Sequence, residues 1–347
     1  MKRKYRKSSF KNKRLKQQQQ QQILKMSSSI DFTASLIFIQ TNLYRIGGPI
    51  IIIIGTTSSI ISLIVFCKKV LRKNPCSVYF VAFNVINFLY VYASILPTSL
   101  SLGYAFHFVT ENLPICRLII YTTFLFDCLS PFYLIMASVD RILITSSNVS
   151  VRQRSTCRLA YKCIIGGALF WMLFQSHALV WTNILQVESN YLYCYFSPGI
   201  YFTFIAYYSL IIKGILVPLL MASLGLWTIK NIRNIRRIRV NPHLIIPRIR
   251  ITNTTTTLLN SKDRQLVLIL LVNIIIYIVF SFMLTAVAMY EQITQNDMKS
   301  FEQIQIDLFA RNVAIFSTYI PFCVNSYINL FVSNTFRNEV KHIISCK

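Results

Sequence analysis

The chain has 347 residues, of which 54% are hydrophobic and only 14% are charged, and its mean hydropathy is +0.51. Because a soluble domain usually carries about 25% charged residues, this composition excludes an ordinary soluble enzyme, and it is too apolar for a disordered chain. The formal net charge of +25 would favour nucleic-acid binding in a soluble protein. Most basic residues here lie in short stretches between apolar runs, however, and we expect a membrane protein that binds no nucleic acid.

Seven apolar runs are long enough to cross a lipid bilayer. A hydrocarbon core about 30 Å thick requires roughly 20 apolar residues of helix. Continuous runs of this length exclude a membrane β-barrel, whose strands alternate in polarity over about ten residues. The sequence therefore predicts an all-α membrane protein, a bundle of seven transmembrane helices within residues 47–331. The predicted spans are 47–67, 76–97, 118–139, 163–185, 200–227, 266–290 and 313–331.

The basic residues between the predicted spans indicate the orientation of the bundle. Beyond residue 25, the loops that follow the odd-numbered spans, together with the tail, contain 21 Lys and Arg residues, whereas the other side contains four. Basic residues near membrane spans stay cytoplasmic, and we expect the amino terminus outside and the carboxyl terminus inside. The predicted protein is a multi-pass plasma-membrane protein with an extracellular segment over residues 1–46 and a cytoplasmic surface helix and tail over residues 332–347.

The first 25 residues conflict with this orientation. They contain ten basic residues and a glutamine run at 17–22, but no apolar core of a signal peptide. A chain that starts at Met26 removes the conflict, because its outer segment has only Asp31 and Arg45 as charged residues. Residues 1–25 are therefore either an extension upstream of the true start or a disordered tail.

The third predicted span carries marked residues at both ends. Cys116 lies at its outer end and Asp140-Arg141-Ile142 at its inner end, with Arg141 25 residues after the cysteine. At a rise of about 1.5 Å per residue, this separation corresponds to about 37 Å, one membrane thickness. The pattern resembles the rhodopsin-like (class A) family of G-protein-coupled receptors, and the chain is similar to a divergent invertebrate peptide receptor. In that family the same spacing joins a disulfide cysteine to the arginine of an acidic-Arg-aromatic motif; here Ile142 replaces the aromatic residue.

The resemblance implies roles for further residues. Cys194, the only cysteine of the second outer loop, is the implied disulfide partner of Cys116 on the oxidising outer face; the alternative is two unpaired thiols. Asp140 and Arg141 are the implied G-protein coupling residues, and the alternative for Arg141 is a cytoplasmic membrane anchor. The residues that fall on marked positions of the family are Asn87, Trp171, Pro218, Asn325 and Phe336.

The end of the chain resembles the membrane-surface helix that follows the seventh span in the family. The spacing of its apolar residues predicts one apolar helix face, with Arg337 and Lys341 beside it for anionic lipid headgroups. Cys346 is a candidate for lipidation. The apolar positions are Phe336, Val340, Ile343 and Ile344.

Several motifs of the family are altered. Its Asn-Pro-x-x-Tyr motif falls on residues 325–329, where Asn325 is kept but Ser326 and Asn329 replace the proline and the tyrosine. Asn87 stands where the family has the acidic residue of its sodium site, and no sodium regulation is expected. The sixth span has no proline between residues 266 and 290. The resemblance thus implies a receptor scaffold with divergent activation machinery.

Two ionisable residues, Asp127 and Lys213, are predicted at membrane depth. A charge at the centre of a span costs about 2.5–3.5 kcal/mol on insertion scales, and we expect both to face the bundle interior. They either form a structural ion pair or divide the charges of a ligand between them. A biogenic amine is disfavoured, because the amine-binding Asp of related receptors falls on Thr123. Beyond residue 25, the outer side has seven acidic against four basic residues, which favours a cationic peptide.

The predicted function is that of a G-protein-coupled receptor. It binds an extracellular ligand, a peptide in preference to an amine, and activates a heterotrimeric G-protein. The membrane lipids are its other partners. Scattered histidines, without His-x-x-x-His or Cys-x-x-Cys pairs or a phosphate-binding loop, predict no enzyme, no metal site and no cofactor. The alternatives are a small transporter or channel whose path Asp127 and Lys213 line, and a non-signalling decoy receptor.

Overall fold

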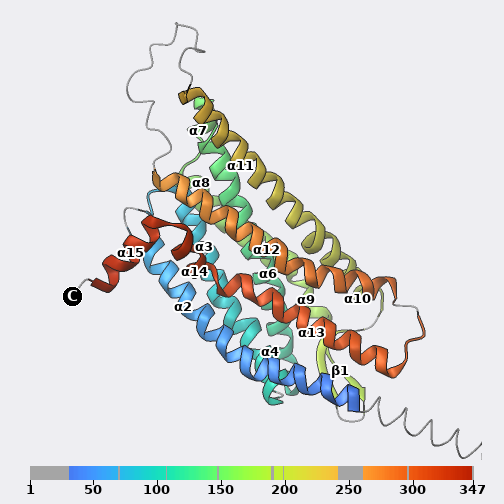
Figure 1. The fold of residues 1–347 in the computed structure, drawn as a ribbon. Helices are drawn as coiled ribbons and strands as arrows, with labels where there is room; N and C mark the ends of the chain where they lie inside the picture. The colour runs from blue at the N-terminus through green and yellow to red at the C-terminus, as the bar shows by residue number, and fades with distance from the viewer. Residues whose placement is uncertain are drawn as a thin grey trace, which may run out of the picture.

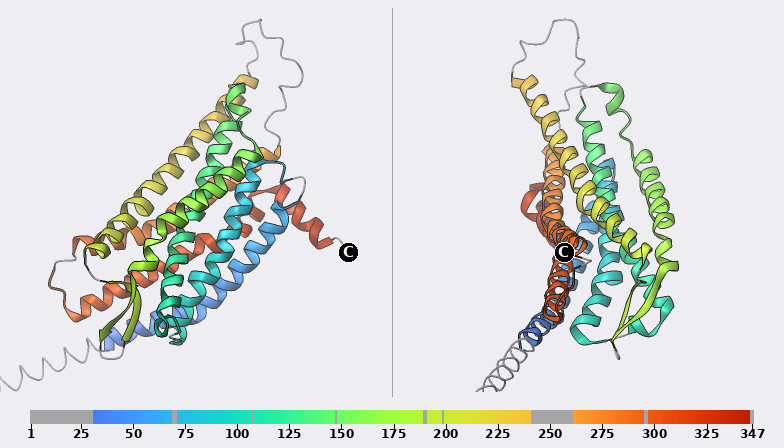
Figure 2. Two further views of the ribbon diagram at one scale, coloured as in Figure 1. Left: turned by 180° about the vertical axis from the view of Figure 1, so that it is seen from behind. Right: turned by 90° about the vertical axis from the view of Figure 1, so that its right-hand side faces the viewer.

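The computed structural model describes residues 31–68, 71–106, 108–146, 148–188, 191–197, 199–240, 261–294 and 297–345. The segment 1–25, the alternative start at Met26 and the lipidation candidate Cys346 lie outside these residues. Within them, helices make up most of the chain and lie side by side in one bundle (Figures 1 and 2).

The elements are long helices, shorter helices and one pair of strands. The long helices are α2 (Gly48–Phe66), α3 (Pro75–Tyr90), α6 (Leu113–Ile144), α8 (Cys157–Gln175), α11 (Val217–Val240), α12 (Ser261–Ile293) and α13 (Phe301–Cys323). The shorter ones are α4 (Leu96–Tyr104), α5 (Phe108–Glu111), α7 (Val149–Arg152), α9 (His177–Trp181), α10 (Ile200–Tyr208), α14 (Asn325–Val332) and α15 (Asn334–Ser345). Three segments are π-helical, η1 (Leu43–Gly47), η2 (Val91–Ile95) and η3 (Ser209–Leu216), and the strands β1 (Thr182–Glu188) and β2 (Tyr191–Phe196) form one antiparallel pair.

The length and polarity of the helices indicate a membrane protein. Six helical segments in the described part of the chain are long and apolar enough to span a bilayer, and α13 with α14 passes the same test as one span bent by 50°. Large apolar side chains also cover the outer surface, with Ile53, Leu173 and Phe282 64%, 76% and 69% exposed. Such a surface is stable in lipid and prone to aggregation in water. The protein is therefore a multi-pass helical membrane protein.

Helix α6 is the central element of the bundle. It packs against α3, α8, α11 and α12, and its 32 residues give a length of about 48 Å. The helix therefore extends from one end of the bundle to the other, and the residues at its two ends belong to different faces of the molecule.

Local signals explain where several helices begin. Asn74 precedes α3, where its side chain accepts a hydrogen bond from the amide of Cys76 and Pro75 occupies the first turn. Thr156 caps α8 in the same way through the amide of Leu159. A side-chain oxygen at this position satisfies an amide that has no partner within the helix. These caps fix the ends of the loops that join the helices.

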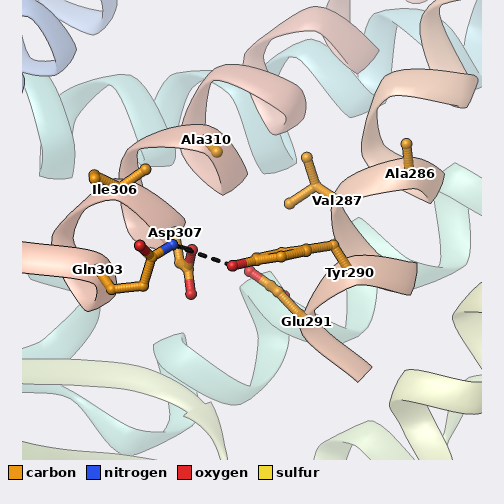
Figure 3. Close-up of a pocket in the computed structure, with 8 residues that line it drawn as sticks. All are labelled: Ala286, Val287, Tyr290, Glu291, Gln303, Ile306, Asp307 and Ala310. Atoms are coloured by element: carbon orange, nitrogen blue, oxygen red, sulfur yellow. Dashed lines mark hydrogen bonds between the residues drawn. The ribbon is translucent and has the colours of Figure 1, made fainter. Parts of the chain in front are cut away.

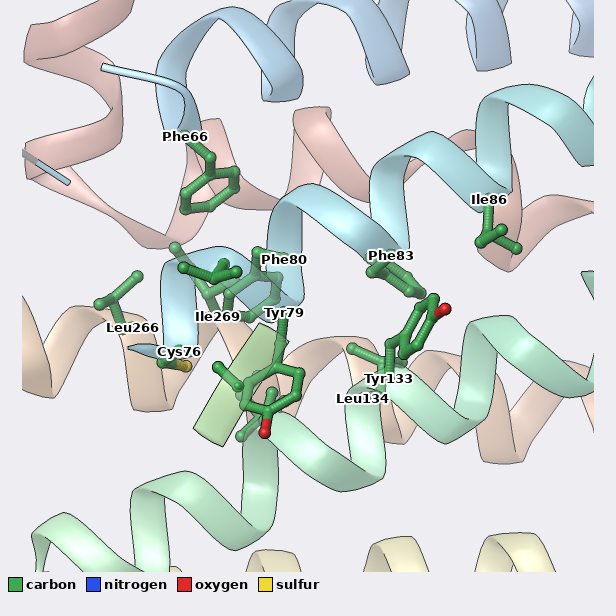
Figure 4. Packing of buried hydrophobic residues seen from close by; sticks show 14 of the residues in the cluster. Phe66, Cys76, Tyr79, Phe80, Phe83, Ile86, Tyr133, Leu134, Leu266 and Ile269 are labelled. Atoms are coloured by element: carbon green, nitrogen blue, oxygen red, sulfur yellow. The ribbon is translucent and has the colours of Figure 1, made fainter. Parts of the chain in front are cut away.

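The largest apolar cluster lies between α2, α3, α6 and α12 (Figure 4). Phe66 and Phe80 stack in it with ring centroids 5.2 Å apart. Phe336 of α15 packs on the same Phe66 ring at 5.6 Å and is 3% exposed. This contact holds α15 against the end of the bundle, and Figure 1 shows α15 leaving the bundle at an angle to the long helices.

Several predicted spans differ from the observed elements. The first, expected at 47–67, belongs to a helical segment that already begins at Asp31, within the residues 1–46 that were expected to precede the bundle. The fourth was expected to be helical to residue 185, but the helical segment Cys157–Trp181 ends four residues earlier and Thr182 begins β1. Pairing with β2 provides the backbone hydrogen bonds that the helix would have supplied. The seventh, expected at 313–331, is a helix from Phe301 to Cys323 followed by a bend and a second helix.

Candidate functional site

Helix α6 carries polar clusters at three levels. Cys116 lies at one end, Asp127 follows after about 16 Å of helix, and Asp140-Arg141 follows after about 20 Å more. Each level joins α6 to different neighbours. The candidate functional site is this series along one helix, together with the bend between α13 and α14.

The first level is a disulfide between Cys116 and Cys194, which the structure contains. It links the end of α6 to strand β2, and both half-cystines are buried. The other strand is held to α6 as well, because Arg117 donates from Nε to the carbonyl of Thr182 at 3.0 Å and from Nη2 to Oδ1 of Asn183 at 3.4 Å. One covalent bond and two hydrogen bonds therefore fix the hairpin on this end of α6.

The second level is an ion pair between Asp127 and Lys213. The Nζ atom of Lys213 donates to Oδ2 of Asp127 at 2.6 Å and lies 4.4 Å from the centroid of the Phe124 ring. The side chains are only 19% and 26% exposed. The carboxylate and the aromatic face together hold the ammonium group, and the two predicted intramembrane charges neutralise each other.

Neutral polar side chains extend this pair. Gln175, which is fully buried, donates from Nε2 to the hydroxyl of Tyr208 at 3.0 Å and to Sγ of Cys128 at 3.3 Å. This cluster adjoins the ion pair, since Cys128 and Tyr208 interact electrostatically with Asp127. Three further tyrosines from α3, α12 and α13 interact with the same carboxylate, namely Tyr90, Tyr277 and Tyr319. Four surrounding helices thus contribute tyrosines around one charge.

Prolines disturb the helices beside both charged residues. Pro131 in α6 has no amide hydrogen for the carbonyl of Asp127, four residues earlier. Lys213 lies in the π-helical segment η3, and Pro218 follows in the first turn of α11. Wide turns of this kind are frequent at functional sites. The backbone at this level is therefore less regular than in the rest of the two helices.

The third level is a buried charge pair at the other end of α6. Arg141 donates from Nη2 to Oδ2 of Asp140 at 3.1 Å and to Oδ1 of Asn74 at 2.5 Å. Ser155, in the loop between α7 and α8, donates to the second oxygen of Asp140 at 2.5 Å. Arg141 is 1% and Asp140 5% exposed. The pair is therefore closed off by the loops before α3 and α8.

The bend between α13 and α14 is surrounded by buried amides and hydroxyls. Asn325 donates to Oδ1 of Asn84 at 2.8 Å, and the amide of Ser326 donates to the hydroxyl of Ser58 at 2.8 Å. Asn87 accepts a hydrogen bond from Ser130 at 2.7 Å. The first two bonds tie the bent segment to α3 and α2, and the third joins α3 to α6.

A pocket of about 330 Å³ opens between α12 and α13 (Figure 3). Two ion pairs adjoin it, Glu291 with Arg311 at 2.7 Å and Asp307 with Lys299 at 2.5 Å. The hydrogen bond that Lys299, in the connecting loop, donates to Asp307 raises the pKa of Lys299. The pocket is lined by Ala286, Val287, Tyr290, Glu291, Gln303, Ile306, Asp307 and Ala310.

The remaining predicted residues, Trp171, Phe336 and Pro218, lie in packing contacts or at a helix junction. Trp171 is partly buried and packs against the largest apolar cluster from α8. Phe336 joins that cluster as described above, and Pro218 lies where η3 changes into α11. These three side chains contribute to packing and helix geometry.

Sequence reasoning missed the partners of the marked residues. Asn74 carried only the signal of a helix cap before Pro75, and Ser155 carried none, because each meets its partner through a loop. Gln175 and Tyr208 looked like isolated polar residues in apolar runs, and a polar residue inside a predicted span was the one available signal.

Comparison with models of known protein families gives no match, and no curated protein matches the sequence.

Proposed function

We propose that the chain is a plasma-membrane receptor with seven membrane spans, its amino terminus outside, that binds an extracellular ligand and activates a heterotrimeric G-protein inside the cell. The proposal counts α13 and α14 as one bent span. It places the Cys116 end of α6 outside and the Arg141 end in the cytoplasm. The extracellular ligand and the G-protein are inferred from the resemblance of the sequence to rhodopsin-like receptors.

The observation that carries the proposal is the arrangement along α6. A disulfide to a loop hairpin lies at one end, a paired Asp127 and Lys213 lie in the middle, and a buried acid–arginine pair lies at the other end. A receptor needs such a connection, because ligand binding on one face must alter the other face. A single helix with sites at three depths supplies it.

Arg141 is the proposed coupling residue. In the described conformation Asp140 and Asn74 hold its guanidinium group away from the surface, which fits a resting receptor. Ligand binding favours a second conformation in which these bonds break and Arg141 contacts the G-protein. The ligand shifts the populations by its higher affinity for that conformation.

The proposed ligand carries positive charge and binds above the Asp127–Lys213 pair. In a chain that starts at Met26, acidic residues outnumber basic ones seven to four on the proposed outer side. Two of those four bases, Lys299 and Arg311, already pair with Asp307 and Glu291, which leaves a net negative entrance. A basic or amidated peptide is attracted to such a surface before contact.

A ligand screen in cells tests the proposal. Wild-type protein, started at Met1 or at Met26, is exposed to a library of neuropeptides while G-protein activation is recorded. Arg141→Ala is the test variant, and Arg158→Ala, which removes an exposed arginine at the start of α8, is its matched control. We expect a ligand-dependent signal that disappears in Arg141→Ala and persists in Arg158→Ala.

The same cells separate the two alternatives. A transporter would accumulate a labelled substrate without activating a G-protein, and its uptake would depend on Asp127 and Lys213 but not on Arg141. A decoy receptor would bind a peptide at the cell surface and activate none of the G-protein classes. Either result would contradict the proposed function.

A further inference from the structure

Ser155 connects a loop to the acid that holds Arg141. It lies in the bend between α7 and α8, and its hydroxyl donates to Oδ1 of Asp140 at 2.5 Å. The other oxygen of the same carboxylate holds Nη2 of Arg141 at 3.1 Å. One carboxyl group therefore lies between a loop hydroxyl and the proposed coupling residue.

The residues around Ser155 are basic and accessible. Arginine lies three positions and one position before it, at Arg152 and Arg154, and Gln153, Arg154 and Thr156 are exposed. Serine/threonine kinases with acidic substrate grooves recognise arginine at such positions by charge complementarity. The bend thus combines a phosphate acceptor with the charges that direct a kinase to it.

We propose that Ser155 is a phosphorylation site for an Arg-directed kinase and that its phosphate captures Arg141 and suppresses G-protein coupling. This inference rests on the proposed function, because ATP and kinases act on the cytoplasmic face. In the transfer, the Ser155 Oγ–P bond forms and the bond from the γ-phosphorus of ATP to its bridging oxygen breaks. ADP leaves with that electron pair, and the hydroxyl proton passes to a carboxylate of the kinase.

The phosphate changes the charge balance around Asp140. It removes the hydroxyl donor of Ser155 and adds a charge of about −1.5 to −2 at pH 7. The phosphorus is attached to Oγ of Ser155, the atom that contacts the Asp140 carboxylate. The phosphate and the carboxylate therefore repel each other. Arg141 is already bound to the same carboxylate that Ser155 contacts. A guanidinium group binds phosphate through two parallel hydrogen bonds, and Arg141 changes its partner from Asp140 to the phosphate.

Neighbouring hydroxyl groups provide contrasts. Thr156 accepts a hydrogen bond from the amide of Leu159 and caps α8. Ser150 lies exposed in α7, and its amide donates to the side chain of Asn148. Neither has a hydrogen bond to Asp140 among the described contacts. Ser150 is therefore a matched control on the same loop.

Labelling of the purified full chain tests the acceptor. Protein in detergent is incubated with the catalytic subunit of cyclic-AMP-dependent protein kinase and radiolabelled ATP, and the labelled residues are mapped by mass spectrometry. We expect close to one phosphate on Ser155 in wild type and in Ser150→Ala, none at this position in Ser155→Ala, and an initial rate about tenfold lower in Arg152→Gln. If mass spectrometry detects the peptide that contains Ser155 and finds no phosphate on it, the inference is overturned.

Reconstituted protein tests the consequence. Wild type, phosphorylated or left unmodified, is compared in vesicles containing a G-protein, with guanine-nucleotide exchange as the readout. We expect at least tenfold slower exchange after phosphorylation, and no change when Ser155→Ala is given the same treatment. The variants Ser155→Asp and Ser155→Asn extend the test, with slower exchange in the charged variant alone. Equal exchange by phosphorylated and unmodified protein would overturn the regulatory role.

The two experiments separate the two proposals. Labelling in detergent requires neither the proposed orientation nor a G-protein. A labelled Ser155 in a chain that activates no G-protein would reject the proposed function and the regulatory role. An active receptor without label on Ser155 would reject this inference alone.

Discussion

The two ends of α6 are held in different ways. At the Cys116 end, a disulfide and the Arg117 hydrogen bonds join the helix to the β-hairpin. At the Arg141 end, the Asp140–Arg141 ion pair is joined to two loops, because Arg141 donates a hydrogen bond to Asn74 and Ser155 donates one to Asp140. A covalent bond persists through a conformational change, whereas hydrogen bonds and ion pairs exchange partners. The comparison indicates a fixed frame at one end of the helix and a reversible contact at the other.

Removing the disulfide is expected to have the largest effect. The bond spans 78 residues of sequence, and closing a loop of this size stabilises a fold by about 4 kcal/mol in the chain-entropy account. Cys116→Ser and Cys194→Ser should lose surface expression to the same extent, and the double variant should be no worse, as measured by flow cytometry. Cys67→Ser, at an exposed cysteine outside any disulfide, is the control. Unequal losses would contradict a frame held by this single bond.

Breaking the ion pair in the middle of α6 should rank second. Removing one partner of a fully buried pair costs about 3–5 kcal/mol. Since Lys213 and Asp127 keep 19% and 26% of their side-chain surface, we expect about 2–3 kcal/mol for Asp127→Asn or Lys213→Met, measured by thermal unfolding in detergent.

The exchanged variant, Asp127→Lys with Lys213→Asp, tests pairing directly. It should recover part of the stability that each single change removes, because opposite charges face each other again. If the exchanged variant is as unstable as the two single variants combined, the residues act independently and the pair does not hold the two helices.

Changes at Asn74 should have a smaller effect on stability and a clear effect on the reversible end. Its Oδ1 atom accepts from both the amide of Cys76 and Arg141. Asn74→Ala removes a helix cap and an acceptor, and we expect a loss of about 1–2 kcal/mol together with faster basal nucleotide exchange. Asn74→Ser should keep the cap while its shorter side chain releases Arg141. Unchanged exchange in both variants would show that Asn74 does not hold Arg141 in the resting state.

The ion pair between Lys68 and Glu339 should have the smallest effect. Its atoms are 2.7 Å apart, but both side chains are about 30% exposed. Exposed pairs contribute about 0–1 kcal/mol, and Lys68→Ala should change the unfolding temperature little. A large loss would show that α15 depends on this pair more than on the packing of Phe336.

The sequence predicted most of the helical spans, because continuous apolar runs have one dominant explanation. It also predicted the Cys116–Cys194 bond from its resemblance and the proximity of Asp127 and Lys213 from the cost of charge in a membrane. Hydropathy did not place the end of the fourth helix at Trp181, because the apolar residues Ile184 and Leu185 follow closely and extended the predicted span. Nor could it predict the bend after Cys323, where the altered motif lacks its proline.

The contacts that loop residues make with the Arg141 end of α6 could not be predicted from the sequence. Asn74 and Ser155 are distant from Asp140 and Arg141 along the chain or separated from them by a short helix. Only the fold brings the loop before α3 and the loop before α8 onto the same end of α6. Periodicity describes single helices, and it contains no information about which loops meet.

The central claim is that α6 transmits binding on one face to a G-protein on the other through Arg141. The most direct measurement uses a ligand found in the screen and records its binding and G-protein activation in the same membranes for wild type and Arg141→Ala. We predict that Arg141→Ala binds the ligand within about threefold of wild type and activates no G-protein. Activation by Arg141→Ala at the wild-type level would contradict the claim.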